Sequence, residues 1–258
     1  MAATSPTRIQ LCGPLSIRVA GMDVTGALPG PQGRFALAYL LGNRARPVTR
    51  GELAEALWAQ APPPEAPTAL RALLSKLRRA LDAAAAGTLP PGDLLQLRLA
   101  GDAWLDVEAA AQALHDAQAA VAQGQDVRAW IASHVALNVS SRTFLAGYEQ
   151  DWVIERRRDL EDLRVAALEA LAACAVRLGG PELDTALRAG RELVRLAPLR
   201  ETGHAHLMRA LAGQGNSAEA LVVYERMRVR LREELGAIPG PELQGLHAEL
   251  LNRRGSGT

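Results

Sequence analysis

Lysine is almost absent from this chain of 258 residues, since Lys76 is the only one and every other basic side chain is an arginine. Alanine is used heavily, and the two biases together are typical of a GC-rich coding sequence. Codon bias does not explain, however, why the one lysine stands beside Arg78 and Arg79 in the stretch LLSKLRRAL.

Cysteines and long apolar runs are also scarce. Cys12 and Cys174 lie far apart in apolar sequence, and a chain of this length builds a sufficient core without a disulfide, so we expect two reduced core residues. No stretch approaches the roughly eighteen apolar residues of a membrane span, and the start MAATSPTRIQL lacks the pattern of a secretory signal. We therefore expect a cytoplasmic protein without membrane contact.

The motifs of common enzyme classes are missing as well. The sequence has no glycine-rich phosphate loop with a following Lys-Ser or Lys-Thr, no Gly-x-Ser-x-Gly and no cysteine pair at metal-binding spacing. His204 and His206 lie two residues apart on a predicted helix and point about 200° away from each other, so they cannot share a metal. We expect no catalytic site, no metal site and no cofactor.

Charge is distributed unevenly, although the net charge is only +1. Residues 1–95 contain ten Lys or Arg against six Asp or Glu, whereas residues 96–258 contain nineteen against twenty-two. The first part of the chain is therefore the basic one.

The first hundred residues predict short strands around three helices. Alternating apolar residues in 9–19 indicate a small β structure, and 34–42 read as a helix. Thr49 and Glu52 have the spacing of a capping box that begins a second helix. The prolines of APPPEAP end that helix, and a third is expected from about 68 to 84.

The third helix has two very different sides. Leu70, Leu74, Leu77 and Leu81 form one apolar stripe, with Leu73 beside it. No acidic residue lies between Glu65 and Asp82. The opposite side is small, polar and basic, which suits a helix lying close to a phosphate backbone and base edges; its residues are Thr68, Ala72, Ser75, Lys76 and Arg79, flanked by Arg71 and Arg78.

These elements together indicate a winged helix-turn-helix DNA-binding domain over residues 1–105. The wing is expected around the turns at 91–92 and 101–102, with strand-like Leu94, Leu95, Leu97 and Leu99. Arg98 is the only basic residue in this segment, so the wing is not expected to dominate binding.

Residues 106–258 read as almost continuous helix. Two similar stretches, which begin at Thr185 and Glu219, are offset by thirty-four residues, the period of tetratricopeptide-like helix pairs. The fold class is therefore mainly α with a small β part, and the second domain is all-α and tetratricopeptide-like. The expected helices are 107–121, 126–137, 149–178, 183–196, 202–213, 217–235 and 241–252.

Several segments in this order resemble bacterial transcriptional activators of the antibiotic-regulatory-protein type, which join a response-regulator-type winged helix to a bacterial transcriptional activator domain. The resemblance covers nearly the whole chain. The segments that carry it are RPVTRGELAEALW, ALRALLSKLRRALDA, FLAGYEQDWVIERRRDLEDL, LAPLRETGHAHLMRALAGQGNSAEALVVYERMR and LREELGAIPGPELQGLH.

The resemblance implies a regulator that binds double-stranded promoter DNA and recruits RNA polymerase, with two protomers on direct repeats. It places the basic side of the third helix in the major groove and Trp58 near a phosphate. Lys76 stands where related proteins usually have an Arg or Lys that contacts a base or a phosphate. Gly92-Asp93 replaces the usual Gly-Tyr of the wing, which leaves open whether the wing contacts DNA.

Two other interpretations remain open. Lys76 could be a solvated cation on an exposed face, and the whole chain could be a helical-repeat interaction module whose winged helix no longer binds DNA. The charge run ERRRDLEDL, residues 155–163, is typical of a solvated helix face. Trp152 and Tyr224 are expected to be core residues. A salt-sensitive interaction with duplex DNA distinguishes the regulator from the interaction module.

Overall fold

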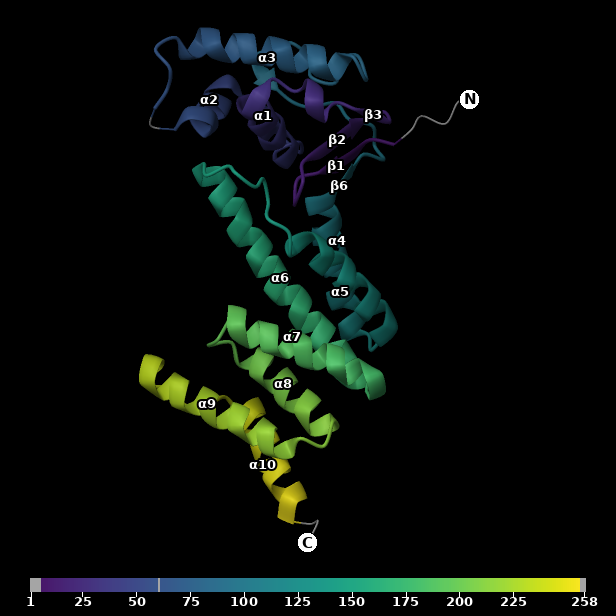
Figure 1. Ribbon diagram of the computed structural model, residues 1–258, viewed down its shortest axis with the longest axis vertical. Helices are drawn as coiled ribbons and strands as arrows, with labels where there is room; N and C mark the ends of the chain where they lie inside the picture. The colour runs from purple at the N-terminus through teal and green to yellow at the C-terminus, as the bar shows by residue number, and fades with distance from the viewer. Residues whose placement is uncertain (1–5, 60, 256–258) are drawn as a thin grey trace. The chain divides into compact units, whose positions relative to one another are not determined.

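The computed structural model describes residues 6–59 and 61–255, with side chains described as far as residue 252. It contains many helices and a few short strands (Figure 1), so the predicted fold class is confirmed. Contacts divide the chain into two compact units. The first consists of Met1–Ala109 and Arg142–Leu160, and the second of Ala110–Ser141 and Glu161–Thr258.

A four-stranded sheet with the order β3-β2-β1-β6 forms most of the β structure of the first unit. β1 runs antiparallel to β2 with Ile9 opposite Ile17, and parallel to β6 with Ile9 opposite Leu105. All three side chains are almost completely buried, so one face of the sheet contributes to the core. The strands are β1 (Arg8–Gln10), β2 (Ser16–Val19), β3 (Met22–Asp23) and β6 (Trp104–Leu105).

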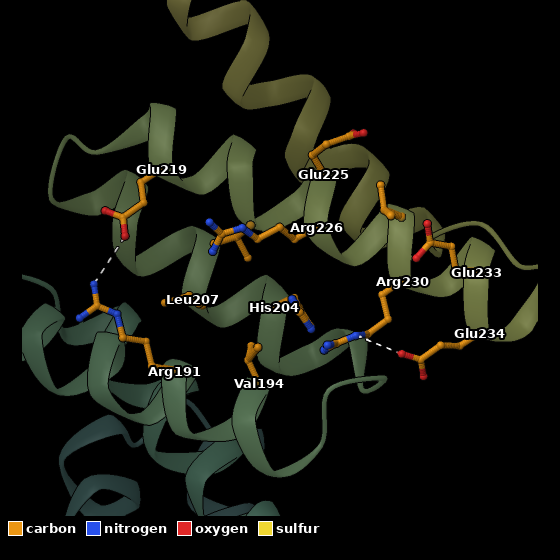
Figure 2. A pocket seen from close by; sticks show the side chains of 12 residues that line it. Arg191, Val194, His204, Leu207, Glu219, Glu225, Arg226, Arg230, Glu233 and Glu234 are labelled. Carbon is orange, nitrogen blue, oxygen red and sulfur yellow. Dashed lines mark ion pairs between the residues drawn. The ribbon is translucent and has the colours of Figure 1, made fainter.

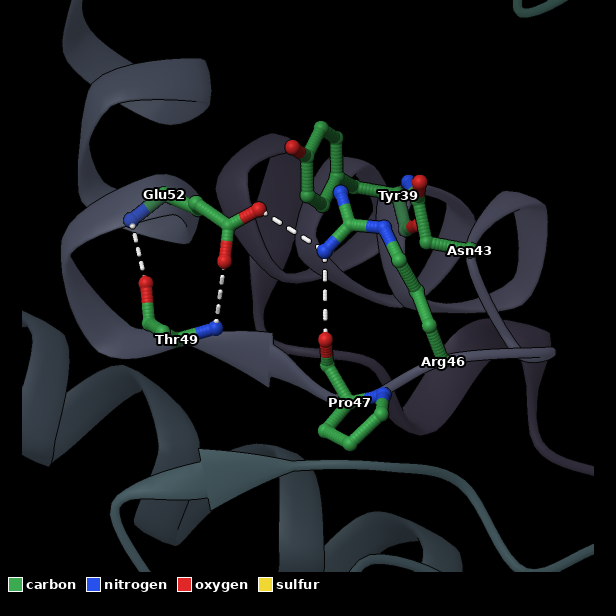
Figure 3. A network of polar contacts seen from close by, with 6 residues as sticks. All are labelled: Tyr39, Asn43, Arg46, Pro47, Thr49 and Glu52. Carbon is green, nitrogen blue, oxygen red and sulfur yellow. Dashed lines mark hydrogen bonds and ion pairs between the residues drawn. The ribbon is translucent and has the colours of Figure 1, made fainter.

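The helices of this unit are α1 (Gly30–Gly42), α2 (Arg50–Trp58) and α3 (Ala66–Asp82), and all three pack against one another. The predicted capping box at the start of α2 is confirmed (Figure 3). Thr49 Oγ1 accepts a hydrogen bond from the Glu52 N–H at 3.1 Å, and the Glu52 carboxylate accepts one from the Thr49 N–H at 2.8 Å. Arg46 also donates to Glu52 at 2.8 Å, which ties the preceding turn to the helix.

A buried carboxylate joins the end of β1 to the start of α4 (Asp106–Ala122). Asp106 Oδ2 accepts hydrogen bonds from the N–H groups of Leu11 at 2.9 Å and Cys12 at 2.8 Å, and Oδ1 accepts one from Val107 at 2.9 Å. Burial raises the pKa of Asp106, while these bonds favour its charged form. The carboxylate thus satisfies backbone donors that have no strand partner.

Segment 142–160 packs on the first unit although it lies far along the chain. Leu145 N–H donates to the Leu11 carbonyl at 3.0 Å, and Gly13 N–H donates to the Thr143 carbonyl at 2.9 Å. Trp152 lies 5.9 Å from the Phe35 ring and 5.0 Å from the Tyr39 ring, measured between centroids. The sequence placed the change of domain at residue 105 alone, whereas the first compact unit is discontinuous in sequence.

The charge run 155–163 is only partly the solvated face that the sequence predicted. Arg157 is half-buried and donates to three carbonyl oxygens, those of Phe144 at 3.0 Å, Leu145 at 3.0 Å and Tyr148 at 2.8 Å. The preceding loop forms no regular ladder there, so its carbonyls need donors from elsewhere. Arginine supplies several donors from one planar group, which makes residue 157 a structural residue.

The helices of the second unit follow the predicted ranges closely. The thirty-four-residue repeat falls on α7 and α9, and α8 packs against both. Gly190 of α7 lies so close to α8 that an added Cβ would be 3.0 Å from the Leu207 Cα. Beyond α4, the helices are α5 (Asp126–Ser140), α6 (Asp151–Leu178), α7 (Leu183–Leu196), α8 (Glu201–Gly213), α9 (Ser217–Leu235) and α10 (Pro241–Gly255).

The predicted core residues are where the sequence placed them. Tyr224 is buried and stacks on His247 at 4.0 Å, and Trp152 lies in the aromatic cluster of the first unit. Cys12 and Cys174 are buried free thiols, and burial raises their pKa to about 12 and about 11. None of the helices described is long and apolar enough to cross a membrane.

Replacing Asp106 with alanine leaves the N–H groups of Leu11 and Cys12 buried without an acceptor. We expect the free energy of unfolding of the first unit to fall by about 2–4 kcal/mol. Urea unfolding followed by tryptophan fluorescence measures this, because most tryptophans lie in this unit. Asp102→Ala, which removes an exposed carboxylate nearby, should change stability by less than about 0.5 kcal/mol; equal losses in both variants would contradict the role of Asp106.

Burial lowers the pKa of His206 below its ordinary value of 6.5, and Arg209 adds to the effect, while Glu169 opposes it. The folded state therefore binds a proton less readily than the unfolded state, and stability should fall as the pH drops below the ordinary histidine range. We expect thermal unfolding, followed by circular dichroism, to occur at a lower temperature at about pH 5.5 than at about pH 7.5. His206→Gln should show a smaller fall; an unchanged fall would contradict this explanation.

Candidate nucleic-acid interface

Helix α3 buries its leucine stripe and exposes its basic side, as the sequence predicted. Leu74 and Leu77 are completely buried. Because residues about half a turn away must face the opposite direction, the polar side points to solvent. Every residue predicted for that side, apart from the flanking Arg78, is exposed: Thr68, Arg71, Ala72, Ser75, Lys76 and Arg79.

Three exposed cations on α3 have no counterion in the part of the chain that the structure describes. Among the residues described, no hydrogen bond or ion pair involves the side chains of Arg71, Lys76 or Arg79. The one carboxylate of the helix, on Asp82, accepts a hydrogen bond from the Gly87 N–H at 2.9 Å. The outer face therefore carries positive charge that is available to an anionic partner, with the small side chains of Ala72 and Ser75 between the cations.

Arg78 differs from the other predicted residues. Its guanidinium is half-buried and donates to the carbonyl oxygens of Leu89 at 3.1 Å and Pro90 at 3.4 Å. Burial lowers its pKa, and the nearby Arg50 lowers it further. Arg78 therefore holds the segment after α3, because its guanidinium donates hydrogen bonds to carbonyl oxygens of that segment.

Arg50, at the start of α2, is a residue of this region that the sequence did not single out. Its guanidinium donates to the Gly92 carbonyl at 3.2 and 2.9 Å and lies 3.5 Å from the Asp93 carboxylate. The acidic residue that replaces the usual aromatic of the wing is thus paired with an arginine. An arginine directly after the helix cap Thr49 was the only sequence signal for it.

The wing is simpler than the sequence predicted. β5 (Leu94–Leu95) pairs antiparallel with β4 (Val48–Thr49), which precedes α2. Leu97 and Leu99, expected in a strand, lie outside the strands. Within the described residues, a single backbone hydrogen bond, from the Arg98 N–H to the Thr88 carbonyl at 2.8 Å, joins this segment to the residues after α3, which is too little for a ladder. Leu97 is nevertheless buried, because an apolar side chain can pack into the core without its backbone pairing in a strand.

Arg98 and Trp58, also predicted to contact DNA, do not belong to α3. Arg98 is exposed and lines a small hollow together with Thr7 and Val19 of the sheet region. Trp58 is the last residue of α2 and is half-buried. The structure therefore places the residues of α3 on one exposed helix face, whereas these two belong to other segments.

The second part of the chain matches a known protein family. The family model described as the bacterial transcriptional activator domain matches residues 105–251. This chain belongs to the bacterial transcriptional activator domain family. The resemblance to antibiotic-regulatory-protein-type activators, read from the sequence segments, is therefore confirmed.

The similarity to known relatives extends over almost the whole length of this chain. AfsR, a regulatory protein of Streptomyces coelicolor, is 34% identical over 238 residues, which cover 88% of this chain but only 22% of AfsR. DnrI, a regulatory protein of Streptomyces peucetius, is 29% identical and is covered to 92%. The chain thus spans about a fifth of the length of AfsR and almost all of DnrI.

A solved structure has the same fold as this activator-domain protein. The Mycobacterium tuberculosis protein EmbR, solved in complex with a low-affinity phosphopeptide, superposes with a TM-score of 0.81 at 25% sequence identity. The match covers 96% of this chain and 65% of the EmbR chain. The winged helix and the tetratricopeptide-like helices therefore occur together in a related protein.

Removal of the Arg78 guanidinium should loosen the segment that follows α3. In Arg78→Ala the carbonyls of Leu89 and Pro90 lose a charged donor, so we expect amide hydrogen exchange of peptides covering residues 88–98 to become about tenfold faster. Mass spectrometry measures the exchange. Arg71→Ala is the matched control, because Arg71 lies on the same helix and its side chain bonds to none of the described residues. The same acceleration in both variants would contradict the tethering role.

Proposed function

We propose that this protein is a sequence-specific DNA-binding transcription regulator that activates transcription from promoter repeats. One observation carries the proposal: the outer face of α3 holds three cations that have no counterion among the described residues, and small side chains separate them. A helix of this kind fits the major groove, where cations meet phosphates and small polar groups approach base edges. The names of the relatives, regulatory proteins AfsR and DnrI, agree with this role.

The division of labour proposed here follows the two predicted domains. Residues 1–105 bind double-stranded DNA, with Lys76 and Arg79 near the centre of the groove and Arg71 at its margin. Arg78 and Arg50 hold the wing segment, so they contribute to DNA binding by positioning that segment and not by contacting DNA themselves. In this proposal Trp58 and Arg98 contact the phosphate backbone of the DNA at the periphery of the interface.

Residues 106–258 supply the contacts to partners. We infer that this domain contacts RNA polymerase and supports pairing of two protomers on direct repeats, because one helix-turn-helix reads too few base pairs for a unique genomic address. The regulator would act in the cytoplasm, where bacterial DNA lies. Most of AfsR lies outside the matched region, and the proposed function concerns only the matched part.

Selection of bound duplexes from a random pool tests the proposal. Enrichment of a repeated motif, followed by titration of that site at two salt concentrations, should give an affinity that falls steeply as salt rises. The repeat spacing then gives the separation of the two protomers. A folded, helical protein that enriches no sequence would instead support an interaction module without DNA affinity.

Substitution of Lys76 identifies its contact. If the ammonium reads a base, Lys76→Ala should weaken binding to the selected site by about 1–3 kcal/mol and relax preference at one position. If it contacts only phosphate, all sequences should weaken alike and the salt slope should fall by about one. Arg232→Ala, an exposed substitution in the helical unit, is the control. Identical affinities and salt slopes for Lys76→Ala and the parent protein would remove Lys76 from the interface.

A further inference from the structure

A hollow of about 680 Å³ lies between α7, α8 and α9 (Figure 2). This volume falls within the range of small-molecule binding sites, about 300–1,000 Å³. All of its lining residues belong to the second compact unit. The hollow is therefore a property of the helical domain alone and does not depend on the proposed DNA interface.

The hollow has an apolar floor. Val194 of α7, Leu207 of α8 and Val223 of α9 line it, each from a different helix. Leu207 is buried, and the two valines are partly buried against the same core cluster. Such a surface favours the apolar part of a ligand, because contact removes more of it from water.

Charged side chains of both signs surround this floor: three arginines, Arg191, Arg226 and Arg230, and four glutamates, Glu219, Glu225, Glu233 and Glu234. Figure 2 shows Arg191 and Glu219 at one end and Arg230 and Glu234 at the other; the ion pairs are 3.6 and 3.2 Å long. Arg226 lies between the two pairs, is exposed, and has no ion pair or side-chain hydrogen bond with any residue that the structure describes. The middle of the hollow therefore has a cation available for an anion.

His204 adds an unsatisfied polar atom to the same lining. Its Nε2 lies 3.1 Å from the Pro198 carbonyl, which can only accept, so Nε2 carries the hydrogen. Its Nδ1 is buried and has no partner among the described residues, although the side chain is 97% buried. Burial lowers the pKa of His204, which favours the neutral ring, and buried polar atoms are normally satisfied, so Nδ1 stands out among the described residues as an acceptor without a donor.

We propose that this hollow binds a small organic anion with an apolar body, whose carboxylate or phosphate pairs with Arg226 and whose apolar part covers Val194, Leu207 and Val223. The charged pairs at both ends favour a compact ligand, because an extended peptide crossing the hollow would have to desolvate both pairs.

Binding of the anionic dye 8-anilinonaphthalene-1-sulfonate to the full chain tests this site. The dye combines a sulfonate with an apolar body, and its fluorescence should rise to saturation with one site per chain. Arg226→Ala should weaken the dye about tenfold, because a charge-assisted contact is lost. Arg232→Ala removes an exposed arginine from the same helix outside the hollow and should bind the dye as the parent does.

Competition identifies the ligand chemistry. Octanoate should displace the dye, whereas 1-octanol, which has the same apolar chain without the charge, should displace it far less. Val223→Trp, which fills the floor, should abolish binding while circular dichroism shows that the helices remain. If this variant does not fold, the comparison of Arg226→Ala with Arg232→Ala still decides the matter.

Four results would overturn the proposal. Unsaturable dye binding, or equal affinity in the parent and Arg226→Ala, would show that the cation does not recognise the anion. Equal displacement by octanoate and 1-octanol would lead to the same conclusion. Displacement by a short peptide of alternating Glu and Leu at lower concentration than octanoate would show that the hollow is a peptide groove. None of these measurements involves DNA, so the proposed regulatory function could fail independently.

Discussion

The two-sided packing of α3 is the constraint on which the candidate interface depends. Leu70, Leu74 and Leu77 are buried against the other helices of the first unit, and each fully buried leucine contributes about 1.5–3 kcal/mol. That burial fixes the rotation of the helix about its axis. Because the rotation is fixed, Lys76 and Arg79 have to face solvent, so the interaction that stabilises the unit also orients the residues proposed to read DNA.

Arginine, which replaces lysine almost everywhere in this chain, also holds the irregular segments. Arg50 donates to the Gly92 carbonyl, Arg78 to Leu89 and Arg157 to Phe144. Each of these segments leaves carbonyl oxygens without a strand or helix partner, and a guanidinium offers several donors in a fixed plane. A lysine ammonium could not reach several carbonyls with the same geometry. Arginine in this chain therefore serves as a tether as well as a surface charge.

Local patterns were sufficient to predict most helices and the exposed face of the candidate site. The capping box at Thr49 and the leucine stripe of α3 depend on residues a few positions apart, and the structure confirms both. The prediction that Leu97 and Leu99 lie in a strand was wrong, because no neighbouring strand pairs with their segment among the described residues. The aromatic contacts of Trp152 with Phe35 were not predicted, since nothing in the sequence says which distant segment an aromatic side chain will meet.

The sequence by itself determined where helices begin and end, which faces are apolar, and which face of α3 is basic, because periodicity and caps act over one or two turns. Tertiary structure alone decided that Arg78 turns to the protein while Lys76 remains free, that Arg50 pairs with Asp93, and that segment 142–160 joins the first unit. It also created the hollow around Arg226. The reason is that long side chains choose partners by distance in space, and those distances exist only once the helices have packed.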